Sequence, residues 1–200
     1  QKIVADITKE AIEIFESSDA EKRVIIVAKE GWNQGVLGIV ASKLVQNYYR
    51  PAIVLTIDPE TNQAKGSARS IDGFDMFQNC MQHRDLFTHF GGHAQAAGMT
   101  LPTENIIELE EKLDRLAQEK LTDADYKPQL LVSGKLSISD IDMSLLETID
   151  QLAPFGMANP KPLFHIEATP SEISQIGATK NHLKMKFVDA GVHMDSIGFG

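Results

Sequence analysis

Short apolar runs alternate with amphipathic helical patterns over the first 122 residues, and this alternation constrains the fold more than any other feature of the sequence. The runs VIIVA (24–28) and PAIVLTI (51–57) have the length and aliphatic content of buried strands. Segments 2–17, 36–49 and 103–122 repeat apolar residues at three- and four-residue steps, which indicates helices packed against a sheet. This order of elements predicts an α/β domain.

Each helical pattern also predicts which side chains face the core. A further helix at 74–83 has Phe74, Phe77, Cys80 and Met81 on one side, so we expect the cysteine to be packed rather than reactive. The corresponding stripes of the neighbouring helices are Val36, Ile39, Val40, Leu44 and Tyr48, and Ile106, Ile107, Leu109, Leu113 and Leu116. The last helix and its tail are strongly acidic, with eight acidic and three basic side chains at 104–125.

The pattern changes after residue 122. The segment TDADYKP (122–128) is polar and ends in proline, which is typical of a linker. Beyond it, one helical pattern at 143–151 lies among short strand patterns at 130–138, 163–169, 172–178, 182–189 and 192–199. This arrangement predicts a second, smaller domain built as a β-barrel.

Two short motifs carry residues suited to binding phosphate. In FGGHAQAAGMTL, neither Gly91 nor Gly92 has a Cβ, so the backbone can approach an anion closely, and His93 follows as a donor. In GSARS, Ser67 and Arg69 lie two residues apart and would share one face of a strand. A hydroxyl and a guanidinium fork match phosphate oxygens, although paired glycines are also typical of a simple tight turn.

A third motif, KNHLKMKF, lies in the second domain. Lys180, His182, Lys184 and Lys186 alternate with mostly apolar residues, so a strand here would have one basic face. Such a face on an oligonucleotide-binding barrel can follow the backbone of a single strand. Lysines on an edge strand also serve simply to deter aggregation, and both interpretations fit.

A metal site is the remaining chemical interpretation of the motifs. Cys80, His83, His89 and His93 form the pattern C-x2-H-x5-H-x3-H, which offers ligand types that zinc uses. Cys80 falls on an apolar helix face, however, and the segment with the glycines is no regular helix. We therefore expect no metal site in this chain.

Composition limits the remaining classes. The net charge of −9 argues against binding nucleic acid through an overall basic surface, so any such binding has to be local. One cysteine and the lack of a signal-peptide pattern predict a reducing, cytoplasmic location. The apolar runs are too short to span a membrane, so we expect no membrane among the partners. Because the sequence opens on Gln1 inside a helical pattern, we expect a longer parent protein.

Four blocks, EGWNQGVLGIVASKLVQNYYRPAIVL, GSARSIDGF, FGGHAQAAGMTL and LAPFGMANPKPLF, occur in that order between Glu30 and Phe164. In order and length they resemble the C-terminal half of the RecJ family of bacterial single-strand-specific DNA exonucleases. The resemblance implies a connector helix at 1–19 from a missing N-terminal DHH domain. It further implies a DHHA1 domain at 20–122, with a mixed sheet flanked by helices, and an OB-fold-like β-barrel at 127–200.

The resemblance also implies an enzyme of DNA repair and recombination that hydrolyses single-stranded DNA from the 5′ end. Mn²⁺ or Mg²⁺ in the DHH domain would activate the attacking water, so this chain alone would hold no metal and be inactive. Ser67 and Arg69 would bind the terminal 5′ phosphate, and Gly91, Gly92 and His93 the phosphate near the scissile bond. His93 would also stabilise transition-state charge. Other DNA-repair proteins would be further partners.

Three alternatives share parts of this pattern. One is a DHH-type phosphodiesterase acting on short RNA or cyclic dinucleotides. The others are a tRNA-binding module of an alanyl-tRNA synthetase and a non-catalytic module that binds nucleic acid or a repair protein. The added barrel and the GSARSIDGF block favour the exonuclease. Asn33 stands where the family often has histidine, which argues against histidine chemistry at that turn.

Overall fold

The computed structural model describes residues 2–18, 22–156, 158–189 and 191–199. The chain divides into two compact units, Gln1–Pro128 and Gln129–Gly200, and each is described by itself. The expected boundary between residues 19 and 20 lies outside the described residues. No helix in the described parts of the chain is long and apolar enough to cross a membrane.

A five-stranded mixed sheet forms the centre of the first unit, with strand order β1-β2-β3-β5-β4. The strands are β1 (Ile25–Glu30), β2 (Ala52–Asp58), β3 (Gln63–Arg69), β4 (His89–His93) and β5 (Ala96–Pro102). β1 and β2 are parallel and are joined through a helix, while every other neighbouring pair is antiparallel. The predicted α/β class and mixed sheet are therefore confirmed.

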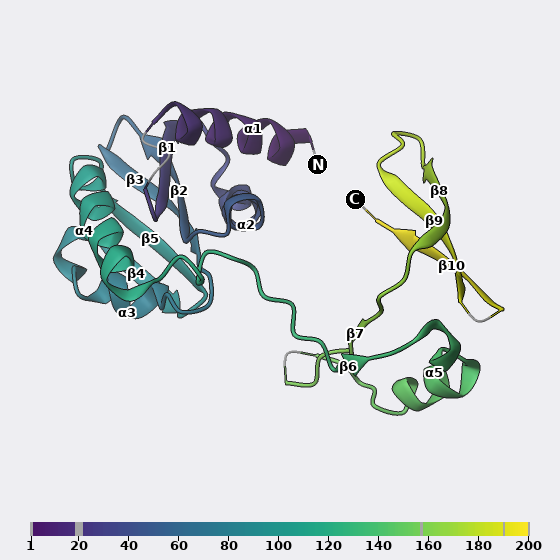
Figure 1. Cartoon of the computed structure of the whole chain (residues 1–200). Coiled ribbons are helices and arrows are strands. Elements are labelled where there is room, and N and C mark those ends of the chain that lie inside the picture. The colour runs from purple at the N-terminus through teal and green to yellow at the C-terminus, as the bar shows by residue number, and fades with distance from the viewer. Residues whose placement is uncertain (1, 19–21, 157, 190, 200) are drawn as a thin grey trace. The chain divides into compact units, whose positions relative to one another are not determined.

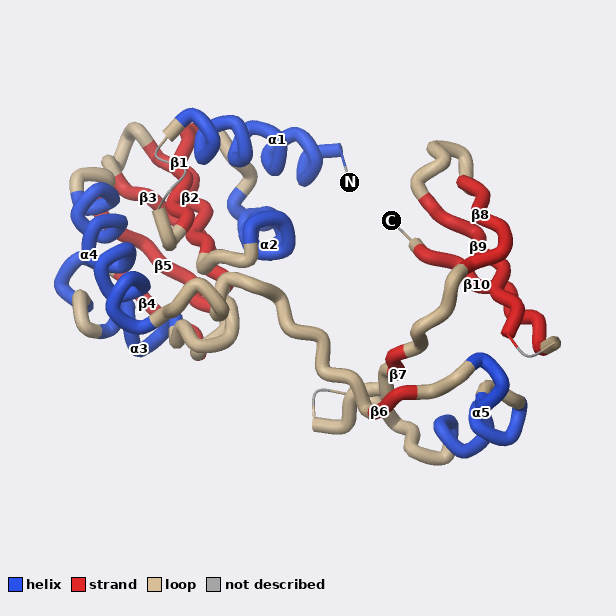
Figure 2. Tube along the Cα trace, viewed as in Figure 1, coloured by secondary structure: helices blue, strands red, loops and turns tan. Residues whose placement is uncertain are grey.

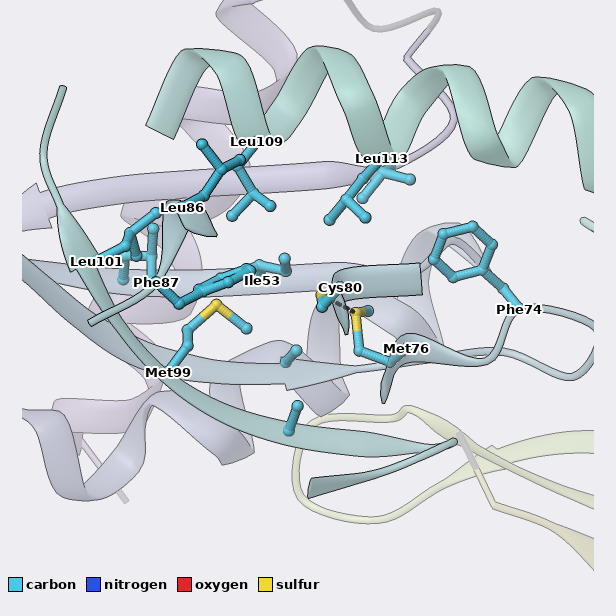
Figure 3. Packing of buried hydrophobic residues seen from close by; sticks show 14 of the residues in the cluster. Ile53, Phe74, Met76, Cys80, Leu86, Phe87, Met99, Leu101, Leu109 and Leu113 are labelled. Atoms are coloured by element: carbon cyan, nitrogen blue, oxygen red, sulfur yellow. Dashed lines mark hydrogen bonds between the residues drawn. The ribbon is translucent and has the colours of Figure 1, made fainter. Parts of the chain in front are cut away.

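Helices cover both faces of this sheet (Figure 1). They are α1 (Lys2–Ser17), α2 (Leu37–Tyr48), α3 (Met76–Met81) and α4 (Asn105–Lys120), with short 3-10 turns η1 (Gln34–Val36) and η2 (Arg84–Leu86). Leu109 and Leu113 of α4 pack over Ile53 and the residues around α3, which form one hydrophobic core (Figure 3). Helices α1 and α2 pack over the opposite face, against β1 and β2.

Three predicted core residues are exposed. Ile39 of α2, Met81 of α3 and Ile107 of α4 have exposed fractions of 52%, 40% and 68%. Each lies beside the stripe of its helix that faces the sheet and not within it. In α4 this stripe consists of Leu109, Leu113 and Ala117. The glycine-histidine stretch, for which the sequence pattern predicted no strand, is itself strand β4.

The second unit contains short strands and one helix (Figure 2), and most residues of its strands are exposed. A three-stranded antiparallel sheet contains β8 (Pro170–Ile176), β9 (His182–Asp189) and β10 (Val192–Gly198). A parallel pair contains β6 (Gly134–Lys135) and β7 (Phe164–His165), both shorter than the strands expected there. Between them lie the turn η3 (Ile138–Asp140) and helix α5 (Met143–Asp150), close to the helix expected at 143–151.

Candidate phosphate-binding face

Three rows of residues cross strands β3, β5 and β4 on one face of the first sheet. The rows are Lys65, Thr100 and His89; Ser67, Gly98 and Gly91; and Arg69, Ala96 and His93. Residues directly opposite one another in antiparallel strands point to the same face of a sheet. These nine residues therefore form one surface, which we call the open face.

Helices leave the open face accessible. Ala52 and Val54 of β2 lie opposite Arg69 and Ser67, so α1 and α2 cover the same side of the sheet, where α1 packs against β1 and α2 packs against β2 and β3. The remaining helices, α3 and α4, pack on the other side. The exposed members of the open face are Lys65, His89, Gly91, His93 and Gly98, and the others are half-buried.

The charge of the open face is opposite to that of the whole chain. Its nine positions carry two cations, Lys65 and Arg69, two histidines and no carboxylate. Helix α4, which has five acidic and three basic side chains, lies behind the sheet. A chain with a net charge of −9 thus presents a local surface suited to an anion.

Ser67 and Arg69 lie in neighbouring rows of the open face, as their spacing predicts. Arg69 is held along the end of β3, where its Nη1 donates a hydrogen bond to the carbonyl oxygen of Ala68 at 2.8 Å. Its Nη2 lies above the first turn of α2, where a Cβ added to Gly38 would come within 2.9 Å. The guanidinium keeps further N–H donors for an anion, since it has five in all.

The two glycines of the FGGH stretch lack a side chain for different reasons. A Cβ at Gly91 would meet no atom within 4 Å, so the bare backbone faces open space as anion binding requires. A Cβ at Gly92 would lie 2.3 Å from the carbonyl oxygen of Ala96 and 2.5 Å from Cα of Ala97. Gly92 is therefore needed for the β4–β5 hairpin itself, and only its main chain can contact a ligand.

His93 is oriented by the turn that follows it. The backbone N–H of Gln95 donates to Nδ1 of His93 at 3.3 Å, so the neutral ring carries its proton on Nε2 and offers an N–H donor. Gln95 is held in turn, because its side chain donates to Asp72 at 3.0 Å and its carbonyl accepts from the N–H of Ser70 at 3.0 Å. The imidazole thus has a defined direction although it is exposed.

A pocket of about 510 Å³ opens on this surface. It is lined by Gln34, Gly66, Ser67, Arg84, His89, Phe90, Gly91, Gly98, Met99 and Thr100. Arg84 and His89 were not among the predicted phosphate-binding residues. The basic residues of HRDLFTHF are visible in the sequence, but only the pairing of β4 with β5 brings them beside Ser67. Asn33, next to Gln34, caps η1 by accepting a hydrogen bond from Gly35 at 2.9 Å.

The basic strand of the second unit differs from its prediction. Lys180 lies before β9, in a turn with a left-handed backbone (φ 54°), so it does not share the strand face. Lys184 lies 3.8 Å from Asp195, and Lys186 lies 2.8 Å from Glu172. The ion pair with Glu172 raises the pKa of Lys186. His182, Lys184 and Lys186 do alternate on β9, but carboxylates on neighbouring strands offset the charge of the lysines.

The cysteine and histidines weighed as zinc ligands lie in different surroundings. Cys80 is fully buried, with its Sγ 3.8 Å from Sδ of Met76 (Figure 3), and burial raises the pKa of its thiol to about 12. His89 and His93 are exposed on the open face. Within the described residues, no group of three or more His, Cys, Asp or Glu side chains could hold a metal ion.

Family comparison identifies both units. Residues 21–119 match the model of the DHHA1 domain, and residues 132–200 match that of the RecJ OB domain. The chain is therefore a DHHA1 domain followed by an OB-type domain. Because the second match is specific to RecJ and the relatives below match along the whole chain, this chain belongs to the RecJ family, as its DHHA1 and OB region.

Curated relatives of this chain include proteins named single-stranded-DNA-specific exonuclease RecJ. The protein from Bacillus subtilis is 46% identical over all of this chain, which covers 25% of it. The protein from Haemophilus influenzae is 32% identical, also over all of this chain, which covers 36% of it. The chain thus spans about a quarter to a third of these relatives.

A solved structure has the same fold. The crystal structure of RecJ from Thermus thermophilus in complex with Mn²⁺ matches 98% of this chain and 28% of its own, with a TM-score of 0.78 at 21% identity. A second structure of that protein contains Mg²⁺ and matches with a TM-score of 0.73.

Proposed function

We propose that the open face binds the phosphates of single-stranded DNA within a RecJ-type exonuclease that degrades the strand from its 5′ end. Ser67 and Arg69 hold the terminal 5′ phosphate, and Gly91, Gly92 and His93 contact the phosphate beside the scissile bond. The observation that carries this proposal is the strand register, which gathers Ser67, Arg69, Gly91 and His93 on one carboxylate-free surface, with the main chain of Gly92 between the last two. The names of the relatives support single-stranded DNA as the substrate.

Each residue has a separate role in this proposal. The guanidinium of Arg69 and the hydroxyl of Ser67 donate to the oxygens of a terminal phosphate, which carries more charge than an internal one. Gly91 allows the next phosphate to lie against the main chain. The Nε2–H of His93 donates to an oxygen whose negative charge grows as the P–O bond breaks, so its hydrogen bond strengthens in the transition state.

The metal-dependent chemistry belongs outside this chain. RecJ structures contain Mn²⁺ or Mg²⁺, whereas the described residues of this chain include no group able to hold a metal. We assign the metals to a DHH domain of the parent protein and assign this chain to substrate binding. The purified chain should not degrade DNA when Mn²⁺ is added. Metal-dependent degradation that copurifies with the chain and scales with its concentration would contradict this assignment.

A comparison of two oligonucleotides tests the phosphate assignment. Calorimetric titration of this chain uses short single-stranded DNA with either a 5′ phosphate or a 5′ hydroxyl. Arg69→Ala should weaken binding of the phosphorylated end by about 1.5 to 3 kcal/mol, the usual effect of removing a charge-assisted hydrogen bond, and leave the hydroxyl end almost unchanged. Equal weakening of both ends would assign Arg69 to an internal phosphate, as a phosphodiesterase acting on short substrates would require.

The second unit provides a further contact in this proposal. His182, Lys184 and Lys186 of β9 contact the backbone of the DNA strand, and Lys180 contributes from the preceding turn. The ion pairs of Lys184 and Lys186 have to open for this, which lowers the net gain. Partners among DNA-repair proteins remain part of the proposal for the parent protein.

A further inference from the structure

The pocket on the open face extends past Gly91 to two side chains that have no role in the proposed function. We propose that Arg84 and His89 form an additional phosphate subsite, which holds the linkage on the 3′ side of the phosphate against Gly91. The inference rests on the proposed function for the direction of the strand. The subsite itself rests on the geometry of η2, β4 and β5.

The position of His89 follows from the sheet. His89 precedes Gly91 by two residues on β4, so both lie on the open face, about 6.6 to 6.8 Å apart along the strand. Successive phosphates of an extended single strand are separated by a comparable distance. Thr100 lies directly opposite His89 on β5 and adds a half-buried hydroxyl beside the imidazole. A backbone that rests on Gly91 can therefore place its next phosphate at His89.

Arg84 adds a positive charge to the same pocket. Its Nη1 donates to the carbonyl oxygen of Phe87 at 2.6 Å, which fixes the side chain and leaves other N–H donors to point into the pocket that it lines. The base is firm, because Phe87 is 5% exposed and its ring packs against Phe90 at 4.9 Å. A held guanidinium and an imidazole that line one pocket suit a phosphate diester.

The nearest carboxylate in sequence acts elsewhere. Asp85 follows Arg84, and its charge acts on Lys112 of α4 and on His83. Helix α4 lies behind the sheet, so these charges balance one another away from the pocket. Among the described residues that line the pocket, none carries a carboxylate and Arg84 is the one cation. The subsite therefore keeps its positive charge.

A double-mutant cycle tests the subsite by combining a side-chain substitution in the protein with neutralisation of one phosphate in the ligand. The ligand is a 5′-phosphorylated thymidine tetranucleotide in which one linkage at a time is replaced by an uncharged methylphosphonate. With the unchanged chain, the linkage that fills the subsite should cost roughly tenfold in affinity when neutralised, as for other charge-assisted bonds. In Arg84→Ala and in His89→Ala, that same replacement should cost at most about twofold, because the coupled partner is gone.

Controls separate this inference from folding and from the proposed function. Arg115→Ala removes an exposed arginine on α4, behind the sheet, and should leave every coupling unchanged. Far-ultraviolet circular dichroism checks that Arg84→Ala keeps its turn, and His89→Ala tests the subsite without touching that turn. Coupling to no linkage, or equal weakening of all modified and unmodified ligands, would overturn the subsite. Absence of a 5′ phosphate preference in the unchanged chain would instead contradict the proposed function alone.

Discussion

The guanidinium of Arg69 lies against Gly38, so closely that a Cβ at residue 38 would come within 2.9 Å of Nη2. The contact arises because α2 packs over β2 and reaches the end of β3, where Arg69 is the last residue. Gly38 lies in the first turn of α2, next to Leu37. The space left by the missing side chain therefore sets where Arg69 lies on the open face.

Gly38→Ala should displace Arg69 without unfolding the domain. Alanine is favoured over glycine in a helix by about 1 kcal/mol, and the crowded atom is the end of a flexible side chain. We expect thermal stability to be kept and the preference for a 5′ phosphate to fall, as measured by titration. Adding Arg69→Ala to this variant should then weaken binding little further. Fully additive effects of the two substitutions would show that Gly38 and Arg69 act independently.

Gly91→Ala and Gly92→Ala form a matched pair: the first should affect DNA binding, and the second should affect the stability of the domain. The Cβ at residue 91 meets open space, so Gly91→Ala should change the free energy of unfolding by no more than about 0.5 kcal/mol. It should nevertheless weaken binding of single-stranded DNA, because the methyl group occupies the floor of the pocket.

The second variant should act on stability instead. The Cβ of Gly92→Ala would collide with the main chain of Ala96 and Ala97, which should destabilise the domain by about 1 to 3 kcal/mol in denaturant unfolding. Equal stability of the two variants would contradict the hairpin geometry. Unchanged DNA binding by Gly91→Ala would show that Gly91 is not part of the phosphate site.

Most of the first unit was predictable because its strands and helices bury apolar side chains. VIIVA and PAIVLTI became β1 and β2, and the stripe of α4 correctly included Leu109 and Leu113. Strand β4 was missed because Gly91 and Gly92 give it no alternating pattern, so its pairing with β5 defines it.

The same limit applies to the candidate site. Ser67 and Arg69 share a face through spacing alone, which sequence reveals. His89 is two residues from Gly91 on β4, but only the pairing of β4 with β5 and β3 brings it beside Ser67, and Arg84 lines the same pocket from the turn η2, which local patterns do not reveal. Lys180 was wrongly assigned to the basic strand face. Its own backbone is left-handed, so the alternation of side chains begins only with β9, at His182.

The stability of the first unit should fall in alkaline solution. Burial raises the pKa of Cys80 to about 12 in the folded state, whereas an unfolded thiol titrates near about 8.5. Stability from the protonated thiol is fully present below the unfolded pKa and is lost as the pH rises toward 12. We expect a decrease of up to about 1.4 kcal/mol per pH unit from this group, measured by urea unfolding under reducing conditions.

Cys80→Ala serves as the control for that titration. It should be less stable at pH 7 because it leaves a small cavity, yet its stability should fall less steeply as the pH rises toward the folded pKa of the thiol. Burial and a hydrogen bond to Glu16 raise the pKa of Tyr48 to about 12. Tyr48 titrates in both proteins and therefore accounts for a loss of stability that the two have in common. Identical slopes would mean that the thiol is not protected from deprotonation in the folded state.

Charge changes on β9 test the second DNA contact. Lys184→Ala combined with Lys186→Ala should weaken binding of long single strands and flatten the dependence of log K on log salt by about one for each phosphate that is no longer neutralised. Glu172→Gln should have the opposite effect on affinity, since it frees Lys186 from a carboxylate at 2.8 Å. An unchanged salt slope in the double lysine variant would leave β9 as ordinary surface.

Placing the acidic helix behind the sheet has a consequence for encounter as well as for binding. At physiological ionic strength the Debye length is about 8 Å, which is less than the diameter of about 10 to 12 Å of a helix such as α4. A DNA strand at the open face is therefore screened from the carboxylates of α4 and attracted by the nearby cations. A strand that approaches from the side of α4 is repelled. If the open face binds single-stranded DNA as proposed, this arrangement favours productive orientations of the strand before any hydrogen bond forms.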